Sequence, residues 1–322
     1  MNQHVDMELI QQRALHDLLN FLVEQHYRFT VISPLTHERV FIRKQNISDT
    51  PRSLRDIFGW NLPFYQQDLD QSLFLILKNA ELIHLQGQQW LSHVRVASLE
   101  DQLFIHSAFP TVETDAVFFG PDTYRFYYHL KQYLLTRPKP VKRSVELCCG
   151  TSAVAIAIAC VFPESAEIFT ADINPKALLY SQINKKFRGV DNIFPKHSNL
   201  FSALDGDFDL IFANPPYLMD LHERQYRHGG NALDGTDLSL NIFKEGIKRL
   251  RAEGALFLYT GIAISYDGNK FLESVDHLMQ HYPDFKYSYE EIDPDVFGEE
   301  LEQPAYQHIE RIALVLVKLS AA

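Results

Sequence analysis

The second half of the chain alternates apolar segments with helical ones, and this alternation constrains the fold more than any other feature. Such an order predicts a mostly parallel α/β sheet with helices on both faces. Ligands of such sheets bind beyond the carboxyl ends of the strands. Strands are predicted at 144–148, 167–171, 208–213, 255–260 and 312–319, and helices at 153–161, 176–186, 239–251 and 269–281.

The first third of the chain follows a different pattern. Helices followed by a small hairpin are typical of a winged-helix or related small α+β module. A chain of 322 residues has room for two domains. We therefore expect a helical, α+β substrate-recognition module over residues 1–110 and a larger α/β domain over 111–322. The module has predicted helices at 6–27 and 68–82 and short strands at 90–96 and 102–106.

Charge and composition narrow the class of partner. The net charge of −11, with acidic residues concentrated between 284 and 310, argues against a polyanionic ligand. Three cysteines, two of them adjacent, suit a reducing cytoplasm, and no secretory signal or apolar membrane span is visible. A modest basic stretch in the first domain instead favours a nucleic-acid partner. It consists of Arg39, Arg43, Lys44, Arg52 and Arg55.

Two local patterns predict a nucleotide-like site. The predicted strand 144–148 runs into a tight turn with Gly150 and then into an Ala/Ile-rich helix, so backbone amides can approach a ligand closely. Asp172 ends the next strand, 22 positions after Gly150, where a carboxylate can accept hydrogen bonds from ribose hydroxyls. The alternative for Asp172 is a cap for the helix that starts at Pro175.

A third motif gives the class of protein. Asn214-Pro-Pro-Tyr217 directly follows a buried strand, and its two prolines remove two amide donors and stiffen the loop. From about Phe118 onward the chain resembles class I S-adenosylmethionine (SAM)-dependent methyltransferases of the Asn-Pro-Pro-Tyr type, which include release-factor glutamine and N6-adenine methyltransferases. The resemblance implies a Rossmann-like, seven-stranded sheet with helices on both faces, SAM as cofactor, and methyl transfer to a planar amide or amino nitrogen.

The resemblance also implies a set of cofactor contacts. The family's cofactor loop has glycine at three alternate positions, whereas here Cys148 and Ser152 flank the one glycine that remains, Gly150. Asn199 stands where the family often has aspartate. The residues that the resemblance places at the cofactor are Glu146, Cys148, Gly150, Asp172, Ile173, Asn199, Leu200, Asn214 and Tyr124.

The expected chemistry depends on the Asn-Pro-Pro-Tyr loop. The Asn214 side-chain oxygen and the Pro215 carbonyl can each accept an N–H of the acceptor, which aims the nitrogen lone pair at the methyl group. Tyr217 is expected to stack on the flat acceptor, or else to pack within the loop. Pro216, Tyr217 and Arg227 are the expected substrate contacts, with the Gly-rich loop 224–235 as a lid or an ordinary connection.

Several functions remain open at this point. A protein substrate with a glutamine-like acceptor, possibly basic, is preferred because of the acidic carboxyl-terminal segment. A nucleobase of RNA or DNA, a small-molecule acceptor and a non-catalytic binding protein are the alternatives. We expect no membrane partner and no metal, since His222 and His228 have no cysteine or carboxylate at useful spacing.

Overall fold

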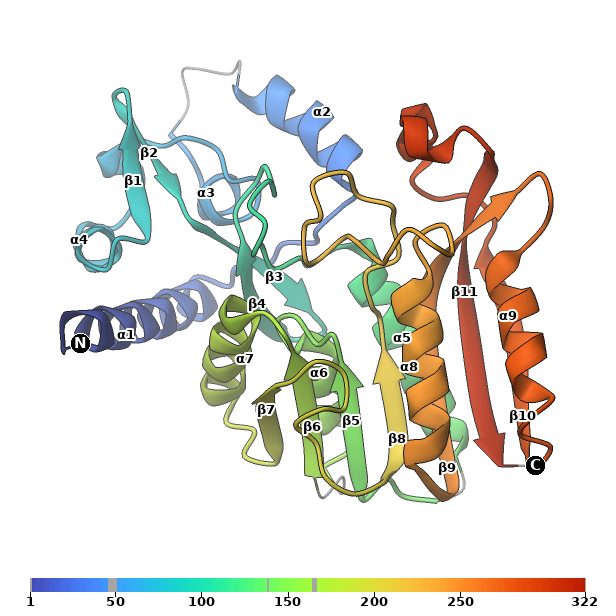
Figure 1. Ribbon diagram of the computed structural model, residues 1–322. Coiled ribbons are helices and arrows are strands. Elements are labelled where there is room, and N and C mark those ends of the chain that lie inside the picture. The colour runs from blue at the N-terminus through green and yellow to red at the C-terminus, as the bar shows by residue number, and fades with distance from the viewer. Residues whose placement is uncertain (1, 46–50, 138, 164–166, 322) are drawn as a thin grey trace.

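A seven-stranded sheet forms the larger part of the molecule in the computed structural model, which describes residues 2–45, 51–137, 139–163 and 167–321 (Figure 1). The strand order is β10-β11-β9-β8-β5-β6-β7. Five neighbouring strands are parallel, and β11 runs antiparallel to both β9 and β10. The seven-stranded, Rossmann-like sheet is confirmed. Its strands are β5 (Arg143–Leu147), β6 (Glu167–Asp172), β7 (Ile193–His197), β8 (Phe208–Ala213), β9 (Leu250–Ser265), β10 (Phe285–Asp293) and β11 (Ile309–Ala321).

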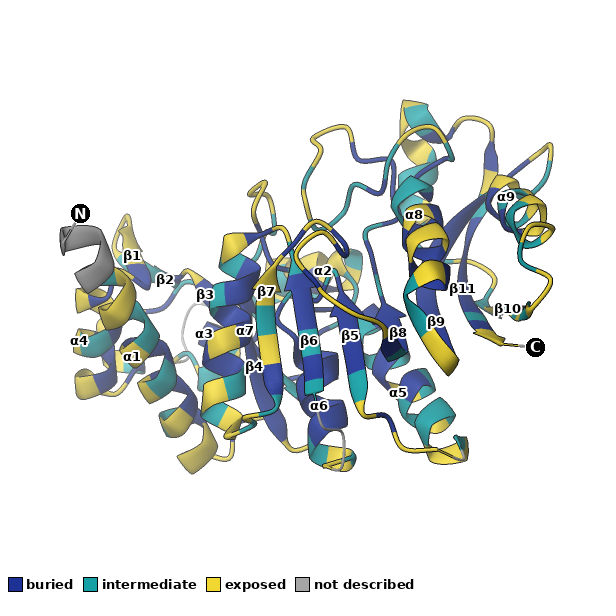
Figure 2. Cartoon of the chain, turned by 60° about the horizontal axis from the view of Figure 1, so that its bottom comes forward, coloured by how far each residue is buried: buried dark blue, intermediate teal, exposed yellow. Residues whose placement is uncertain are grey.

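Helices cover both faces of this sheet, as predicted, and bury its apolar strands (Figure 2). The helix α6 is buried at every position from 153 to 159, which explains why its sequence is Ala- and Ile-rich all round. The helices α5 (Pro121–Thr136), α6 (Ala153–Val161) and α7 (Pro175–Arg188) share one apolar core, and α8 (Asp237–Gly246) and α9 (Lys270–Met279) belong to the other.

The strand order places a crevice at the end of β5. From β5 the chain adds β6 and β7 on one side, and it then crosses to add β8 and β9 on the other. The connections leaving the carboxyl ends of β5 and β8 therefore diverge. In sheets of this type, ligands bind at this point of divergence.

The amino-terminal region is helical, as predicted, and ends in two hairpins. The predicted helices at 6–27 and 68–82 correspond to α1 and α4, whereas α2 and α3 were not predicted. A single strand over 90–96 is wrong, because the chain breaks at His93 and the two halves pair with different partners. The elements are α1 (Asn2–Glu24), α2 (Pro34–Gln45), α3 (Leu54–Phe58), α4 (Gln71–Asn79), β1 (Ile83–Gln86), β2 (Gln89–Ser92), β3 (Val94–Leu99) and β4 (Gln102–Ser107).

This region shares a core with the sheet. A single apolar cluster extends from α1 through β3 and β4 to α7, and the Ile105 amide donates to the Asn184 side-chain oxygen at 3.0 Å. A division at residue 110 and a likeness to a winged helix stay predictions. Helix α2 lies above the carboxyl ends of the parallel strands, on the side where the loop after β8 emerges (Figure 1). Within the described ranges, the longest helices are too short or too polar to span a bilayer.

Candidate active site

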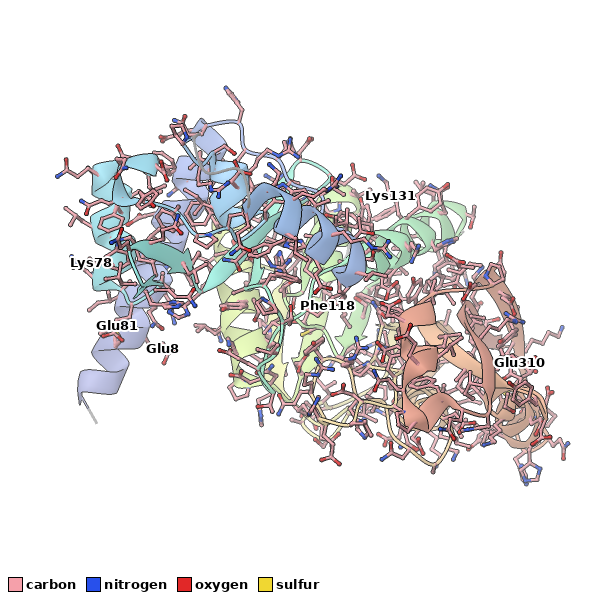
Figure 3. All side chains as sticks on the ribbon, turned by 90° about the horizontal axis from the view of Figure 1, so that it is seen from above. Glu8, Lys78, Glu81, Phe118, Lys131 and Glu310 are labelled. Carbon is pink, nitrogen blue, oxygen red and sulfur yellow. The ribbon has the colours of Figure 1, made fainter. Side chains whose placement is uncertain are left out.

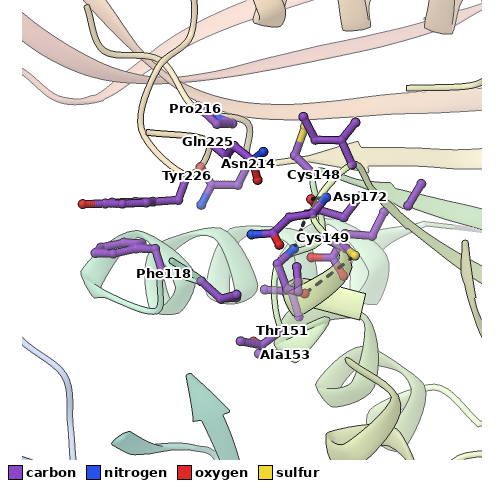
Figure 4. Close-up of a pocket in the computed structure, with 18 of the residues that line it drawn as sticks. Phe118, Cys148, Cys149, Thr151, Ala153, Asp172, Asn214, Pro216, Gln225 and Tyr226 are labelled. Atoms are coloured by element: carbon purple, nitrogen blue, oxygen red, sulfur yellow. Dashed lines mark hydrogen bonds between the residues drawn. The ribbon is translucent and has the colours of Figure 1, made fainter. Parts of the chain in front are cut away.

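A cavity lies at the carboxyl ends of β5, β6 and β8, at the divergence point of the sheet (Figure 4). The turn after β5, the end of β6 and the loop after β8 each contribute to its wall. Eight of the nine residues predicted at the cofactor line this cavity, although their role stays a prediction. They are Glu146, Cys148, Gly150, Asp172, Ile173, Asn199, Leu200 and Asn214.

The turn after β5 has left-handed backbone at every second residue. The φ angles are 53° at Cys148, 51° at Gly150 and 55° at Ser152. These are the three positions at which the resemblance predicted glycine, and the geometry gives the reason, because glycine adopts positive φ without strain. Cys148 and Ser152 hold the same turn at a backbone cost of about 1–2 kcal/mol each.

The Asp172 carboxylate holds the turn against the end of β6. Its Oδ2 accepts the Gly150 amide at 2.9 Å, and its Oδ1 accepts the Asn174 amide at 2.9 Å. Burial raises the pKa of this carboxyl, while the two amide hydrogen bonds oppose the shift. Each oxygen keeps a second lone pair, so the carboxylate can still accept hydrogen bonds from a ligand in the cavity. The Asn174 side chain, rather than Asp172, caps helix α7 by accepting the Lys176 amide.

Glu146 brings a second buried carboxyl to the same cavity. Its Oε2 accepts the Ala155 amide at 3.1 Å in the first turn of α6. Burial, with the nearby Asp172 charge, raises the pKa of Glu146 to about 8. Neither carboxyl group forms an ion pair with a cation among the described residues, which favours a ligand that carries positive charge. A sulfonium and an α-ammonium group would provide such a charge.

We expect Asp172→Ala to weaken SAM binding by about 1–3 kcal/mol, because the ribose hydroxyls would lose a buried acceptor and the turn would lose its anchor. Isothermal titration calorimetry measures the change. Asp172→Asn is the matched control, since it keeps one acceptor oxygen and should weaken binding less. Unchanged affinity in the alanine variant, with an unchanged melting temperature, would rule out a ribose contact.

A second cavity of about 560 Å³ adjoins the first and opens beside α2. The two cavities share four lining residues: Phe118, Asn214, Pro216 and Tyr226. The Asn214 side chain is half-buried, and within the described part of the chain it makes no hydrogen bond. An amide group therefore stands unpaired where the cavities meet, close to Gln225 and Tyr226 (Figure 4).

Tyr217 does not present its ring for stacking. It is only 7% exposed, and its hydroxyl donates to Asp122 Oδ2 at 2.6 Å. A side chain at Gly261 would collide with the Tyr217 ring, so the ring packs directly on the β9 backbone. The prediction that Tyr217 stacks on the acceptor is corrected accordingly. The ring is packed into the fold, as the alternative prediction had it, although Tyr217 still lines the second cavity.

The aromatic rings at the junction are Phe118 and Tyr226, which stack with ring centroids 5.9 Å apart. Neither ring was predicted at the site individually, although Tyr226 belongs to the loop 224–235 that was predicted as a lid or a connection. Seen from above, Phe118 lies between the amino-terminal region and the carboxyl-terminal strands (Figure 3). Tyr226 is held in place by its hydroxyl, which donates to the Thr111 carbonyl at 2.8 Å. Tyr124, predicted at the cofactor, lies outside the cavity lining, and its hydroxyl accepts the Val31 amide at 3.0 Å. The structure does not place Tyr124 with the other eight residues, and its role as a cofactor contact stays a prediction.

The predicted substrate contacts Pro216 and Arg227 both line the second cavity, as does Pro215. The Arg227 guanidinium pairs with Glu300 and with Asp220, so its charge is already balanced within the fold. Loop 224–235 contributes residues 224–227 to the lining of the two cavities. The Gln225 amide ties it to the loop before α5 by donating to the Thr114 carbonyl. Within the described ranges, the His, Cys, Asp and Glu side chains form no group of three suited to a metal ion.

This arrangement joins a carboxylate-rich cavity, a free amide and a second cavity large enough for an extended substrate segment. Comparison with known protein families finds a match in the central part of the chain. Residues 130–281 match the methyltransferase small domain family. This segment contains β5, the turn, Asp172 and the Asn-Pro-Pro-Tyr loop, so the cavity-forming residues of the sheet lie within the match.

Individual relatives resemble only part of the chain. The ribosomal protein uL3 glutamine methyltransferase of Neisseria meningitidis serogroup A is 32% identical over 131 residues, which are 38% of this chain and 43% of the relative. The protein of the same name from Neisseria gonorrhoeae is 33% identical over 132 residues, with 38% and 44% covered. The chain thus spans less than half the length of the curated relatives it matches.

Among solved structures, the comparison matches the ribosomal protein L11 methylase of Lactobacillus delbrueckii subsp. bulgaricus. It is 16% identical, with a TM-score of 0.40, and covers 62% of this chain and 79% of that chain.

Proposed function

We propose that this protein is a SAM-dependent methyltransferase that transfers a methyl group to the side-chain amide nitrogen of glutamine in a protein substrate. The observation that carries the proposal is the unpaired Asn214 amide where the two cavities meet. The named activity of the partial relatives, glutamine methylation of a ribosomal protein, supports the same acceptor class.

The residues of the first cavity fit SAM. Asp172 keeps lone pairs for the ribose hydroxyls, Asn199 and Leu200 provide a wall for the adenine, and Glu146 is placed for a cationic group. The first turn of α6 adds the positive end of a helix dipole, which suits a carboxylate. When bound, SAM supplies a methyl group on a sulfonium, which leaves as a neutral thioether without needing an acid.

Asn214 and Pro215 have the positioning role in this mechanism. An amide nitrogen shares its lone pair with the carbonyl, so the protein must hold the nitrogen where that lone pair is available. The Asn214 side-chain oxygen and the Pro215 carbonyl can each accept one N–H of the acceptor. Both hydrogen bonds strengthen as the nitrogen gains positive charge, and they therefore lower the barrier rather than only improve binding. The nitrogen releases a proton to water once the new N–C bond has formed.

The amino-terminal module, residues 1–110, is proposed to recognise the substrate. Its residues Pro34, Leu35 and Glu38 line the second cavity opposite the Asn-Pro-Pro-Tyr loop. The acidic rim of the same cavity, Glu299 and Glu302, favours a basic protein over a nucleic acid. The three cysteines are free thiols, in agreement with a reducing cytoplasm as the proposed location.

Purified bacterial ribosomal protein uL3 provides a direct test. We expect incubation with SAM and this protein to add the mass of one methylene group to uL3, located by peptide mass spectrometry on a glutamine side chain. An Asn214→Ala variant serves as the negative control. A methyl group on a lysine, arginine or backbone site, or no modification of uL3 or any other ribosomal protein, would contradict the proposal.

A further inference from the structure

The second cavity contains a buried positive charge that the proposed chemistry does not use. Arg95 lies on β3 in the amino-terminal region and is only 4% exposed, yet it lines the cavity. Its Nε–H donates to the Ser107 carbonyl at 3.0 Å, and its guanidinium lies over the Phe109 ring at 5.8 Å. Among the residues that the structure describes, no carboxylate lies within ion-pair distance of this guanidinium and no acceptor pairs with its two terminal nitrogens.

The surroundings of Arg95 do not compensate its charge. Burial lowers the pKa of Arg95 to about 10, which still leaves the group cationic at neutral pH. The neighbouring His37 is neutral, since burial together with Arg95 lowers its pKa to about 4. The cavity's buried acid Asp122 is bound by the Tyr217 and Tyr259 hydroxyls and pairs with Arg125, and Glu300 pairs with Arg227.

A buried guanidinium without a counter-ion is costly, and the Ser107 hydrogen bond and the Phe109 ring offset only part of the desolvation of Arg95. Folds retain such groups where a ligand supplies the partner. Arginine presents its terminal nitrogens as a planar fork that matches the two oxygens of a carboxylate. The two terminal nitrogens of Arg95 are the free part of this fork, on the wall of a cavity that also reaches Asn214.

We propose that Arg95 binds a carboxylate of the protein substrate, such as an aspartate or glutamate side chain near the acceptor glutamine. This inference rests on the proposed function for the identity of the substrate. A single carboxylate fits better than a nucleic-acid backbone, because Glu38, Glu299 and Glu302 line the same cavity without ion-pair partners among the described residues. Their negative charges repel a polyanion more strongly than a single carboxylate. Of the described arginines that line this cavity, Arg224 and Arg227 are already paired with acids, which leaves Arg95 for that carboxylate.

Binding of small anions tests the site without any methyl transfer. The full chain is saturated with SAM and heated with one of three compounds, each at about 50 mM and constant ionic strength. They are N-acetyl-L-glutamate α-amide, whose one carboxylate is in the side chain, N-acetyl-L-glutamine α-amide, which has no carboxylate, and inorganic phosphate. We expect only the glutamate derivative to raise the melting temperature of the wild type, by roughly 1–3 °C. The increase should vanish in Arg95→Gln and persist in part in Arg95→Lys.

Three results would overturn the inference. They are no stabilisation of the wild type, equal stabilisation of wild type and Arg95→Gln, and stronger stabilisation by phosphate than by the carboxylate. The last would assign the site to a nucleic-acid acceptor. Equal SAM affinity in all variants confirms that each is folded. This test measures no methylation, so its result is independent of the proposed function. Stabilisation that depends on Arg95 would support the anion site even if no protein became methylated. Methylation of a protein would not support the anion site if that stabilisation were absent.

A second measurement separates ligand binding from a structural role. Arg95→Met loses one hydrogen bond, to the Ser107 carbonyl, but it also removes a buried charge that has no counter-ion. Without ligand it should therefore lower the melting temperature less than a matched arginine replacement does. Arg249→Met is the matched control, since its guanidinium already bonds the Leu204 and Gly206 carbonyls and its loss should lower the melting temperature. A comparable decrease for Arg95→Met would show that the fold itself compensates Arg95, and would contradict the inference.

Discussion

Replacing Asn214 by alanine is expected to lower the turnover of methyl transfer by a factor of about 10² or more while SAM affinity changes little. The Asn214 amide is unpaired within the described part of the chain and faces both cavities, so its removal breaks no internal hydrogen bond. The variant loses a hydrogen-bond acceptor, and the hydrogen bond to that acceptor strengthens as the substrate nitrogen becomes cationic. Single-turnover rates and SAM titration separate the two effects.

Asn199→Ala is the matched control for this prediction. Asn199 lines only the first cavity, so its loss should weaken SAM binding and leave the rate at saturating SAM largely unchanged. The opposite pattern, with Asn214→Ala impaired in SAM binding and normal in turnover, would place the reacting nitrogen elsewhere. Equal turnover in both variants would show that another group orients the acceptor.

Glu146→Gln is expected to stabilise the protein relative to the wild type as the pH rises. Burial raises the pKa of Glu146 to about 8, so between about pH 4.5 and 8 the folded state holds a proton that the unfolded chain has lost. The wild type therefore loses stability across this range, by on the order of 3–5 kcal/mol, and glutamine does not titrate. Denaturant unfolding of both proteins at pH 5 and pH 9 measures the difference.

Saturating SAM provides a control for the Glu146 prediction. Its positive charge favours the ionised carboxyl, so the bound wild type should lose less stability between pH 5 and 9 than the free protein does. Asp172 titrates in both proteins and cancels in the comparison, since burial raises the pKa of that carboxyl as well. If the free energies of unfolding of the wild type and Glu146→Gln changed in parallel between pH 5 and 9 without SAM, Glu146 would be ionised in the folded protein over that whole range. That result would contradict the prediction.

Much of the site was predictable because its signals are local. The turn after β5, the acid at the end of β6 and the rigid loop after β8 each occupy a few consecutive residues. The parallel sheet then brings these three strand ends together. The buried strands were recognisable as apolar runs. The strands β7 and β10 were not, since both lie at edges of the sheet and carry exposed polar residues.

The remaining features depend on contacts between distant residues, which spacing alone does not reveal. Tyr217 turns into the fold because Asp122, 95 positions earlier, accepts its hydroxyl hydrogen bond. Phe118 and Tyr226 meet at the junction only once loop 224–235 packs on the loop before α5. Arg95 falls within the predicted strand 90–96, where its position in the sequence does not distinguish it from other basic residues. Its burial beside Phe109 depends on contacts that form only in the folded chain.

The most direct test of the account is the class of molecule that accepts the methyl group. The purified protein is incubated with methyl-labelled SAM and a cell lysate, and the macromolecular fraction is then digested separately with protease and with nuclease. We expect the label to be released by protease, to resist nuclease and to be absent with Asn214→Ala. Label released by nuclease alone, or found only in small metabolites, would contradict a protein glutamine acceptor.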